Sequence, residues 1–218
     1  MDLHKVIEHT ILKPDCTFDN IHRLCDEALQ YKFYGVCVPP YFVRDAVRFL
    51  NEQAKVITVV GFPMGYSTIP SKVEEIKRAL DEEANEIDAV VNICAIKSGN
   101  WNYVKNEIDS MMRAVSMKGR IMKLIIETGL LTKTEVKQLL PIAEANGVHF
   151  IKTSTGVNAD GATVEAVKFL RENLSPKIKI KASGGIKSFE MAEKLLISGA
   201  DRIGTSNGVQ IAMQTKNN

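Results

Sequence analysis

Short apolar runs rich in β-branched residues alternate along this chain with longer segments whose apolar residues recur at helical spacing. Segment 21–29 is typical of the longer kind, because its apolar residues stand at positions i, i+3, i+4, i+7 and i+8 and form one face of a helix. Eight runs have the length and composition of buried strands. The predicted strands are Val6–Leu12, Gly35–Pro39, Val56–Gly61, Ile87–Ile93, Ile121–Glu127, His149–Thr153, Ile178–Ser183 and Arg202–Thr205.

Signals at the helix ends support these segments. Ser71-Lys-Val-Glu74 and Thr132-Lys-Thr-Glu135 each contain the hydroxyl and the carboxylate of a capping box, which satisfies free amides in the first turn of a helix. Residues that tolerate a left-handed backbone follow three of the predicted helices: Asn85, Gly147 and Gly199.

Regular alternation of strand and helix predicts a parallel sheet covered by helices. Eight such units predict an α/β fold, a closed (β/α)8 TIM barrel, although 218 residues is shorter than the usual length of about 250. We expect residues 1–218 to form this single domain, with a short strand and helix segment at the N-terminus. The alternative is a doubly wound open sheet, which is disfavoured because no Gly-x-Gly-x-x-Gly turn follows the first strand.

Composition and charge narrow the class of protein. An apolar fraction of 45% and a charged fraction of 25% are ordinary for a soluble globular domain. The 28 basic and 26 acidic residues are interspersed and leave a net charge of +2, so we expect no nucleic-acid partner. No uncharged apolar stretch of about 18 residues predicts a membrane span. Residues 1–8 lack the apolar core of a signal peptide, so we expect a cytosolic protein.

The cysteines and histidines form no metal-ligand pattern. They are Cys16, Cys25, Cys37, Cys94, His4, His9, His22 and His149, with no Cys-x-x-Cys pair. Their spacing does not support a metal site. We expect reduced thiols that pack as small apolar groups.

Charged and polar residues in or near the predicted strand ends indicate where chemistry would occur, because barrel active sites form at the carboxyl ends of the strands. They are Glu8, Asp88, Asn92, Glu127, Lys152 and Lys181. The two lysines lie on adjacent predicted strands. An amine attacks a carbonyl only in its neutral form, and a second ammonium nearby, together with partial burial, lowers the pKa of a lysine from about 10.4. One interpretation of this pattern is that Lys152 is the amine that forms a Schiff base with an aldehyde, with Asp88 moving protons.

A structural interpretation stands beside this one. Each lysine could pair with Asp88 or Glu127 and simply compensate charge inside the barrel. The pattern alone does not separate the two interpretations.

Small, glycine-rich segments follow the last three predicted strands, at residues 153–156, 183–186 and 204–208. Glycines let backbone amides approach an anion, and phosphate sites after strands seven and eight recur in this fold. We therefore expect a phosphate site here, with plain tight turns as the alternative.

With these residues in view, the chain resembles the deoxyribose-phosphate aldolase family of class I aldolases. The stretch Phe150-Ile-Lys-Thr-Ser-Thr-Gly156 is one of several motifs that occur in the family's order and spacing. The others are Ile7–Asp15, Gly35–Pro39, Val60–Gly65, Glu86–Ile93, Lys97–Gly99, Lys123–Thr128, Lys181–Ile186 and Arg202–Ser206.

The resemblance implies reversible cleavage of 2-deoxy-D-ribose 5-phosphate to D-glyceraldehyde 3-phosphate and acetaldehyde, in deoxyribonucleoside catabolism. By motif position, Lys152 matches the Schiff-base lysine, Lys181 the second lysine and Asp88 the aspartate of the proton relay. Thr155 matches a residue near the substrate hydroxyl. The phosphate cradle matches Gly156, Gly184, Gly185, Gly204 and Ser206. The resemblance implies no cofactor or metal, and we expect a homo-oligomer, either a dimer or a tetramer.

The chain also departs from the family pattern. Glu8, Pro39, Lys187 and Asn207 stand where aspartate, asparagine, arginine and serine are common. Segment 157–160 is unusually polar, and no tyrosine follows Tyr103, so a C-terminal tyrosine device is absent or replaced. Cys37 lies near the predicted pocket, where we expect a packed thiol. The competing hypotheses are a transaldolase-like Schiff-base enzyme with another donor, a sugar-phosphate-binding protein without turnover, and a metal-dependent aldolase.

Overall fold

Eight parallel strands close into a barrel in the computed structural model, which describes residues 3–215. The strands are β1 Ile7–Thr10, β2 Gly35–Val38, β3 Lys55–Val60, β4 Glu86–Val90, β5 Ile121–Ile125, β6 Phe150–Lys152, β7 Lys179–Ser183 and β8 Arg202–Thr205. Each strand pairs with the next, and β1 pairs with β8. This confirms the predicted (β/α)8 fold.

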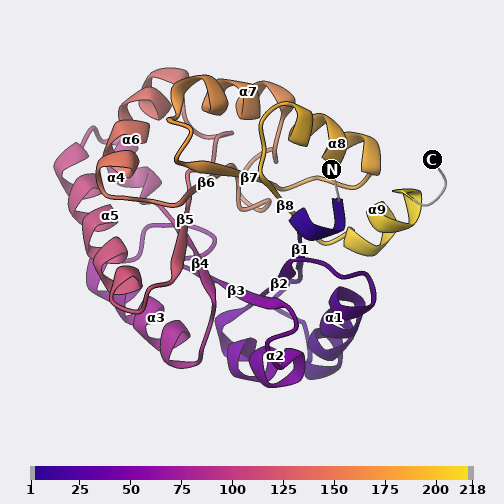
Figure 1. Ribbon diagram of the computed structural model, residues 1–218. Helices are drawn as coiled ribbons and strands as arrows, with labels where there is room; N and C mark the ends of the chain where they lie inside the picture. Colours follow the sequence, from indigo (N-terminus) through magenta and orange to yellow (C-terminus); the bar gives the residue numbers. More distant parts are fainter. Residues whose placement is uncertain (1–2, 216–218) are drawn as a thin grey trace.

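Helices form a ring around the barrel, as the view along its axis shows (Figure 1). They are α1 Phe18–Gln30, α2 Val43–Leu50, α3 Ile69–Asp81, α4 Ile93–Lys97, α5 Trp101–Ser116, α6 Lys133–Ala145, α7 Val164–Asn173, α8 Phe189–Ile197 and α9 Gly208–Thr215. Two short 3-10 helices, η1 Leu3–Val6 and η2 Pro40–Phe42, precede β1 and α2. The N-terminal segment is therefore a single helical turn that leads directly into the first strand of the barrel.

Most predicted strands extend one to three residues too far. The prediction for the fourth strand is wrong at its end, because the Asn92 side chain accepts a hydrogen bond from the amide of Ala95 and so caps α4. The fifth strand ends before Glu127, which adopts a left-handed backbone with φ of 51°.

The helix signals were right in part. Thr132 and Glu135 form the predicted capping box of α6, and Gly147 and Gly199 adopt the predicted left-handed conformation. The box predicted at Ser71 is wrong, because α3 begins three residues earlier than predicted, with Thr68 as its N-cap.

The prediction that Asn85 adopts a left-handed backbone is also wrong. Glu83 has the positive φ instead, at 70°, and the Asn85 side chain accepts a hydrogen bond from the amide of Val56 at 2.8 Å. The turn before β4 is thereby tied to β3.

The interior of the barrel has an apolar side and a charged side. The main core lies between the strands and the helices. A separate small apolar cluster of Cys37, Ile57 and Val59 comes from β2 and β3. Across the next strand pairs, the register sets Val59 beside Asp88 and Asp88 beside Lys123. The charged side chains therefore gather toward β4–β8 and β1.

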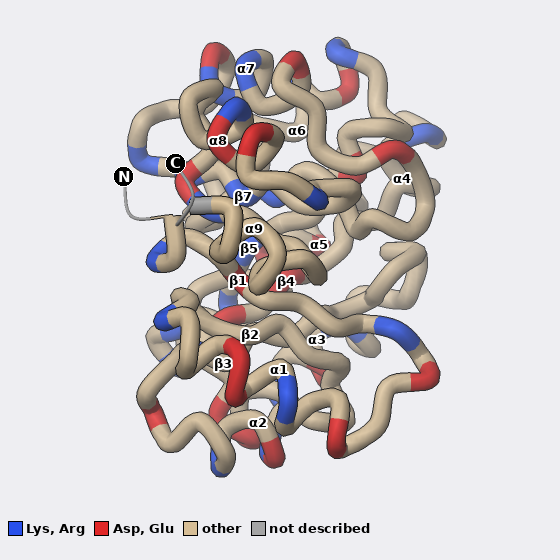
Figure 2. The backbone as a smooth tube through the Cα atoms, turned by 90° about the vertical axis from the view of Figure 1, so that its right-hand side faces the viewer, with Lys and Arg blue, Asp and Glu red and all other residues tan. Residues whose placement is uncertain are grey.

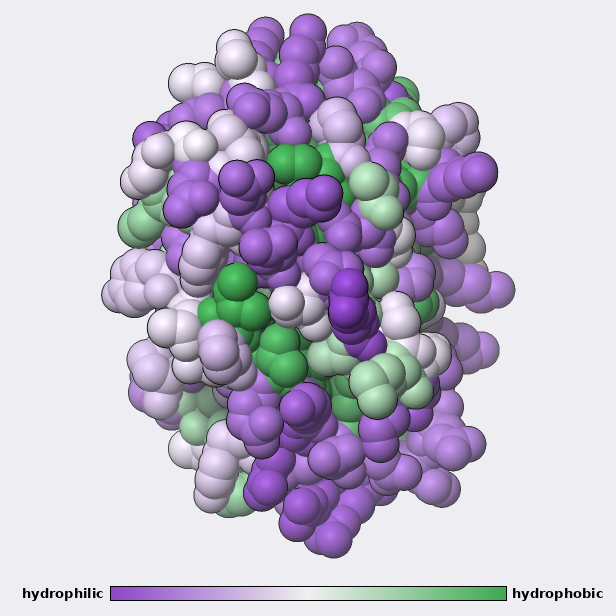
Figure 3. Space-filling model, turned by 90° about the vertical axis from the view of Figure 1, so that its left-hand side faces the viewer, coloured by the Kyte–Doolittle hydropathy of each residue, from purple (hydrophilic) through white to green (hydrophobic). Residues whose placement is uncertain are grey.

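Charge and hydropathy are mixed over the outer surface. Figure 2 shows both charge signs on the outer helices and also on strands inside the ring. The face in Figure 3 is largely hydrophilic, with only small green areas. None of the helices within residues 3–215 combines the length and the hydropathy that a bilayer crossing requires.

Replacing Thr132 with alanine is expected to lower the free energy of unfolding by about 1 kcal/mol, since α6 then loses the side-chain acceptor for its first turn. Urea unfolding of the variant and the intact protein measures this difference. An unchanged urea midpoint would show that the box contributes nothing to stability.

Candidate active site

Seven charged side chains meet inside the barrel, and none is more than 8% exposed. This charged cluster consists of Glu8, Glu86, Asp88, Lys123, Lys152, Lys181 and Arg202. They come from six strands, β1 and β4 to β8. Only the closed barrel brings β1 and these later strands together.

Asp88 is the centre of the charged cluster. Its Oδ2 accepts hydrogen bonds from Lys152 Nζ at 2.8 Å and from Lys181 Nζ at 2.6 Å, and its Oδ1 accepts one from Lys123 Nζ at 2.9 Å. The strand register makes Lys152 and Lys181 direct neighbours across β6 and β7. The structure thus brings the three predicted catalytic residues into contact.

Two glutamates complete the compensation of charge. Glu8 accepts hydrogen bonds from Lys181 and, at 2.9 Å, from Arg202 Nη1. The Arg202 guanidinium lies 3.4 Å from the centre of the Tyr34 ring, and the Tyr34 hydroxyl donates to Glu86. A glutamate at position 8 therefore keeps direct contact with Lys181 of the lysine pair.

Charges within the cluster shift the pKa values of Asp88 and Lys181 more than burial does. Burial alone would raise the pKa of Asp88, but the ammonium groups of Lys123, Lys152 and Lys181 hold that pKa well below its usual range. Burial alone would lower the pKa of Lys181, but Asp88 and Glu8 raise it above its ordinary value. Asp88 is therefore ionised and Lys181 is charged at neutral pH.

The three lysines of the charged cluster differ in how well they are compensated. Among the described residues, Lys123 has ion pairs with three carboxylates, Lys181 with two, and Lys152 with Asp88 alone. The alternative in which a lysine pairs with Glu127 is wrong, because the hydrogen bonds of that carboxylate go to Thr155 and Asn158.

A cavity of about 360 Å³ opens above the cluster at the carboxyl ends of the strands. It is lined by Lys152 and Lys181 and by every residue predicted for substrate or phosphate contact: Thr155, Gly156, Gly184, Gly185, Gly204 and Ser206. Two of the departures from the family pattern, Lys187 and Asn207, also line it, as does the exposed Lys13. Asp88 lies buried among the lysines.

Two of the predicted glycines have roles that differ from each other. Gly184 has a φ of 89°, and a Cβ there would come within 2.9 Å of the Gly161 Cα, so this close crossing of two loops requires glycine. A Cβ at Gly204 would lie 2.8 Å from Lys181 Cε. Gly204 therefore makes room for the second lysine in addition to lining the cavity.

Several members of the charged cluster were not predicted as site residues: Lys123, Glu86, Arg202 and the contacting Tyr34. Strand alternation could have indicated two of them. Glu86 precedes Asp88 by two positions, and Arg202 precedes Gly204 by two, so each shares the inward face of its strand with a predicted residue.

Cys37 is fully buried beside the charged cluster. Burial raises the pKa of its thiol to about 11. The thiol is therefore protonated and poorly nucleophilic at neutral pH, as expected for a packed cysteine. Within residues 3–215, no group of three or more histidine, cysteine, aspartate or glutamate side chains could hold a metal ion.

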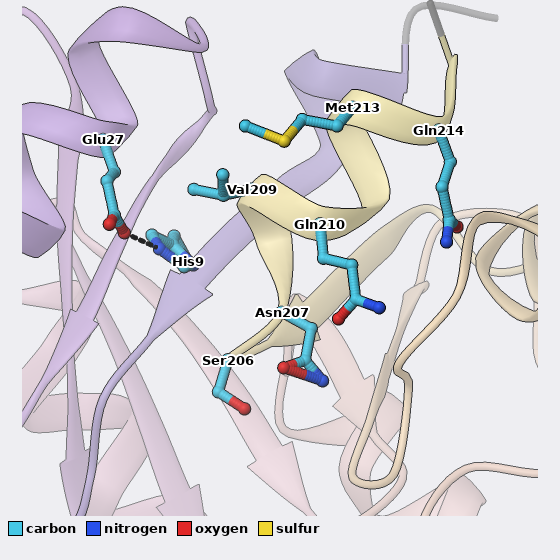
Figure 4. Close-up of a pocket in the computed structure, with 8 residues that line it drawn as sticks. All are labelled: His9, Glu27, Ser206, Asn207, Val209, Gln210, Met213 and Gln214. Atoms are coloured by element: carbon cyan, nitrogen blue, oxygen red, sulfur yellow. Dashed lines mark hydrogen bonds and ion pairs between the residues drawn. The ribbon is translucent and has the colours of Figure 1, made fainter. Parts of the chain in front are cut away.

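A second cavity, of about 480 Å³, shares Ser206 and Asn207 with the first and lies beside α9 (Figure 4). His9 and Glu27 line this second cavity, with His9 Nε2 2.7 Å from Glu27 Oε2. Val209 and Gln210 line it from α9. No lysine is among the described residues that line it, whereas Lys152 and Lys181 line the first cavity.

A closed (β/α)8 barrel with buried lysines and carboxylates beneath an open cavity is the architecture of a barrel enzyme with amine chemistry. A family model described as "DeoC/LacD family aldolase" matches residues 4–212. The chain belongs to this aldolase family.

Individual relatives are similar to this chain over nearly its whole length. A deoxyribose-phosphate aldolase of Thermococcus gammatolerans is 44% identical over 220 residues, covering 100% of this chain and 98% of its own. One of Caldanaerobacter subterraneus is 44% identical over 99% of this chain and 94% of its own. The solved structure of a deoxyribose-phosphate aldolase from Aeropyrum pernix, described as tetrameric, superposes with a TM-score of 0.92 at 29% identity over 98% of this chain and 91% of its own.

Replacing Asp88 with asparagine is expected to lower the free energy of unfolding by about 3–5 kcal/mol at pH 7, because three buried ammonium groups lose their shared carboxylate. The pKa of Asp88 is lowered on folding, so its stabilisation is present above an unfolded-state pKa of about 3.9 and is lost as the pH falls toward the folded-state pKa. The difference between the two proteins should therefore be smaller at pH 3.

Urea unfolding at pH 7 and pH 3 measures both values. Asp109, whose exposed carboxylate pairs with Arg113 on α5, offers the control: asparagine there should cost at most about 0.5 kcal/mol. Equal costs for the two substitutions would contradict the central place of Asp88.

Proposed function

We propose that this protein is a class I aldolase that reversibly cleaves 2-deoxy-D-ribose 5-phosphate to D-glyceraldehyde 3-phosphate and acetaldehyde, in deoxyribonucleoside catabolism. The observation that carries the proposal is Lys152, a cavity-lining amine that shares the Asp88 carboxylate with a second lysine, Lys181. Membership in the aldolase family and the names of the full-length relatives support the same substrate.

The cations of the charged cluster outnumber its carboxylates, and Lys152 is the least compensated of its lysines. The charged cluster holds three carboxylates and four cationic groups, so it becomes neutral when one ammonium loses its proton. Lys152 has the fewest carboxylate partners of the three lysines.

In the synthetic direction, neutral Lys152 attacks the carbonyl of acetaldehyde, and charged Lys181 gives its proton to the hydroxyl that leaves as water, so that a protonated imine and a neutral Lys181 remain. Asp88 and Lys181, acting through a water, remove a proton from the methyl carbon and leave an enamine. The enamine carbon attacks the aldehyde of glyceraldehyde 3-phosphate, and hydrolysis of the imine releases the sugar phosphate. The protonated imine serves as the electron sink, so the reaction requires no organic cofactor or metal.

The glycine-rich loops after β6, β7 and β8 suit the phosphate. Gly156, Gly184 and Gly185 line the cavity, with open space beside Gly185, and α8 and α9 begin shortly after the loops that line it. Gly204 and Ser206 also line the cavity, and Lys187 supplies a positive charge where arginine is common. Holding the phosphate there orients the acceptor aldehyde toward the enamine.

Replacing Lys152 with leucine is expected to reduce the cleavage rate by at least about 10³-fold, because the covalent intermediate can no longer form. An assay of acetaldehyde release from deoxyribose 5-phosphate measures this rate. The same change at Lys168, an exposed lysine on α7, is the control and should leave the rate unchanged. Undiminished cleavage by the Lys152 variant would refute the Schiff-base assignment.

The same assay separates the rival functions. Activity should persist in chelator, whereas its loss would indicate a metal-dependent aldolase. Use of dihydroxyacetone in place of acetaldehyde as donor would indicate a transaldolase-like enzyme. Absence of cleavage by the intact protein would favour a sugar-phosphate-binding protein.

We also propose that residues 1–218 act as one domain within a cytosolic homo-oligomer, a dimer or a tetramer. The pairing of β1 with β8 makes the two ends of the chain parts of one barrel. All four cysteines are free thiols, which suits a reducing compartment. An exposed aromatic group offers an association surface: Tyr41 is 73% exposed, and its ring contacts Phe18 and Phe42.

Light scattering is expected to give two or four times the 24.2 kDa mass of the chain. Replacing Tyr41 with glutamate should shift the protein toward smaller species, because the aromatic surface then carries a charge. The same change at Met117, an exposed residue after α5, is the control. A monomer mass for the intact protein would contradict the proposed assembly.

A further inference from the structure

Lys72 and Glu107 form a buried ion pair outside the charged cluster. Lys72 comes from α3 and Glu107 from α5, helices that are neighbours in the ring around the barrel (Figure 1). Both side chains are 0% exposed, and Lys72 Nζ lies 2.7 Å from Glu107 Oε1. Neither is among the described residues that line the cavity above the lysines. The pair therefore acts, if it serves the site, through other residues.

Lys72 joins two backbone segments at the carboxyl ends of the strands. Its Nζ donates to the backbone oxygen of Gly65, in the loop after β3, at 2.6 Å and to that of Val90, the last residue of β4, at 2.7 Å. With Glu107, these acceptors take up all three protons of the ammonium group. Glu107 Oε2 accepts from the amide of Asn92, just after β4, at 2.9 Å. The pair thus holds the loop after β3 against the end of β4.

The loop from Gly61 to Gly65 closes on itself and is held at both ends by α3. The Gly65 amide donates to the Gly61 oxygen at 2.8 Å, and the Gly61 amide donates to Glu75 Oε2 of α3 at 2.8 Å. Phe62 lies inside this loop, where it lines the cavity and packs against the small apolar cluster of β2 and β3. The position of this cavity wall therefore depends on how α3 holds the loop.

The loop lies so close to β4 that no side chain fits at Gly65. Its φ is 75°, and a Cβ there would lie 2.3 Å from the backbone oxygen of Val91 and 2.9 Å from Cγ1 of Val90. Val90 follows Asp88 by two positions, so both side chains share one face of the strand. The loop therefore packs directly on the strand that carries the central carboxylate.

Burial disfavours the charged forms of both members of the pair. It lowers the pKa of Lys72 and raises the pKa of Glu107, and the attraction between the two charges offsets these shifts only in part. A buried ion pair often contributes less to stability than apolar side chains of similar volume. Apolar side chains, however, could not donate to two separate backbone segments. The contribution specific to this pair is the position that it gives to the loop.

We propose that Lys72 and Glu107 are positioning residues, which hold the loop after β3 against β4 and thereby place Phe62 as a wall of the substrate cavity. This inference rests on the proposed function, since the ligand that the wall confines is the sugar phosphate. A loop that leaves β4 widens the cavity beside Phe62 and weakens binding of the sugar phosphate. The hydrogen bonds of Asp88 with the lysines do not involve the loop and remain.

Replacing Lys72 with methionine is expected to raise KM for the sugar phosphate about tenfold with little change in kcat, because the apolar side chain cannot donate to Gly65 and Val90. It also leaves Glu107 buried without its cation, which lowers stability. The double variant Lys72→Met, Glu107→Gln removes that unpaired charge, so its urea midpoint should recover in part while KM stays high. Recovery of KM together with the urea midpoint would refute the positioning role.

Gly65→Ala tests the same contact without changing any charge. The added Cβ would lie 2.3 Å from the Val91 oxygen, so the loop must move away from β4, and KM should rise as in Lys72→Met.

The chain provides a matched control for Gly65. Gly147 has a φ of 74°, and no atom of the described residues would lie within 4 Å of a Cβ there, its chain neighbours apart. Gly147→Ala therefore imposes the same backbone strain without the contact and should leave KM unchanged. Ile76→Val, a buried change on α3 one turn after Lys72, should lower the urea midpoint and also leave KM unchanged.

Borohydride trapping of acetaldehyde on Lys152 should proceed equally in the intact protein, in Lys72→Met and in Gly65→Ala. An intact protein that neither traps acetaldehyde nor cleaves the sugar phosphate would refute the proposed function and this inference with it. If the intact protein cleaves the substrate, an unchanged KM in Gly65→Ala or in folded Lys72→Met would refute the inference alone. An equal rise of KM in the Gly147 or Ile76 variant, or loss of trapping in the two test variants, would do the same.

Discussion

The sharing of the Asp88 carboxylate by three buried ammonium groups is the interaction on which the rest of this structure depends. Charges inside a barrel are costly unless they are paired. Asp88 offers one oxygen to Lys123 and the other to Lys152 and Lys181, while Glu8 and Glu86 compensate the remaining charge. The groups that make the interior stable are therefore the groups that the proposed chemistry uses.

The closed barrel and the loops have different roles in the site. Closure brings Glu8 of β1 against Lys181, although 173 residues separate them in the sequence. The loops after β6, β7 and β8 then form the cavity wall above the lysines, with glycine where two backbones cross. A rigid sheet thus sets the positions of the reacting groups, and the loops set what the cavity can bind.

Much of this arrangement could be predicted from local patterns. Strand–helix alternation predicts the barrel, and the position of Lys152 and Lys181 on successive strands predicts their contact, which the register confirms. Contacts among Glu86, Tyr34 and Arg202 could not be predicted, because they depend on how strands distant in sequence align when the barrel closes.

Predictions from local patterns were also wrong where more than one residue was suited to the same structural role. Thr68 and Ser71 are both acceptable helix caps, and the structure uses Thr68. The polar segment 157–160 had no local explanation, because the partner of Asn158 lies 95 residues away at Pro63. Such roles become visible only when the loops are placed in space.

The central claim is that Lys152 is the amine that reacts, and one measurement tests it directly. The protein is incubated with acetaldehyde, reduced with borohydride, digested and mapped by peptide mass spectrometry. We predict one added ethyl group, on the peptide that contains Lys152, with Lys123 and Lys181 unmodified. An ethyl group on Lys181, or no adduct on any of the three lysines, would contradict the account.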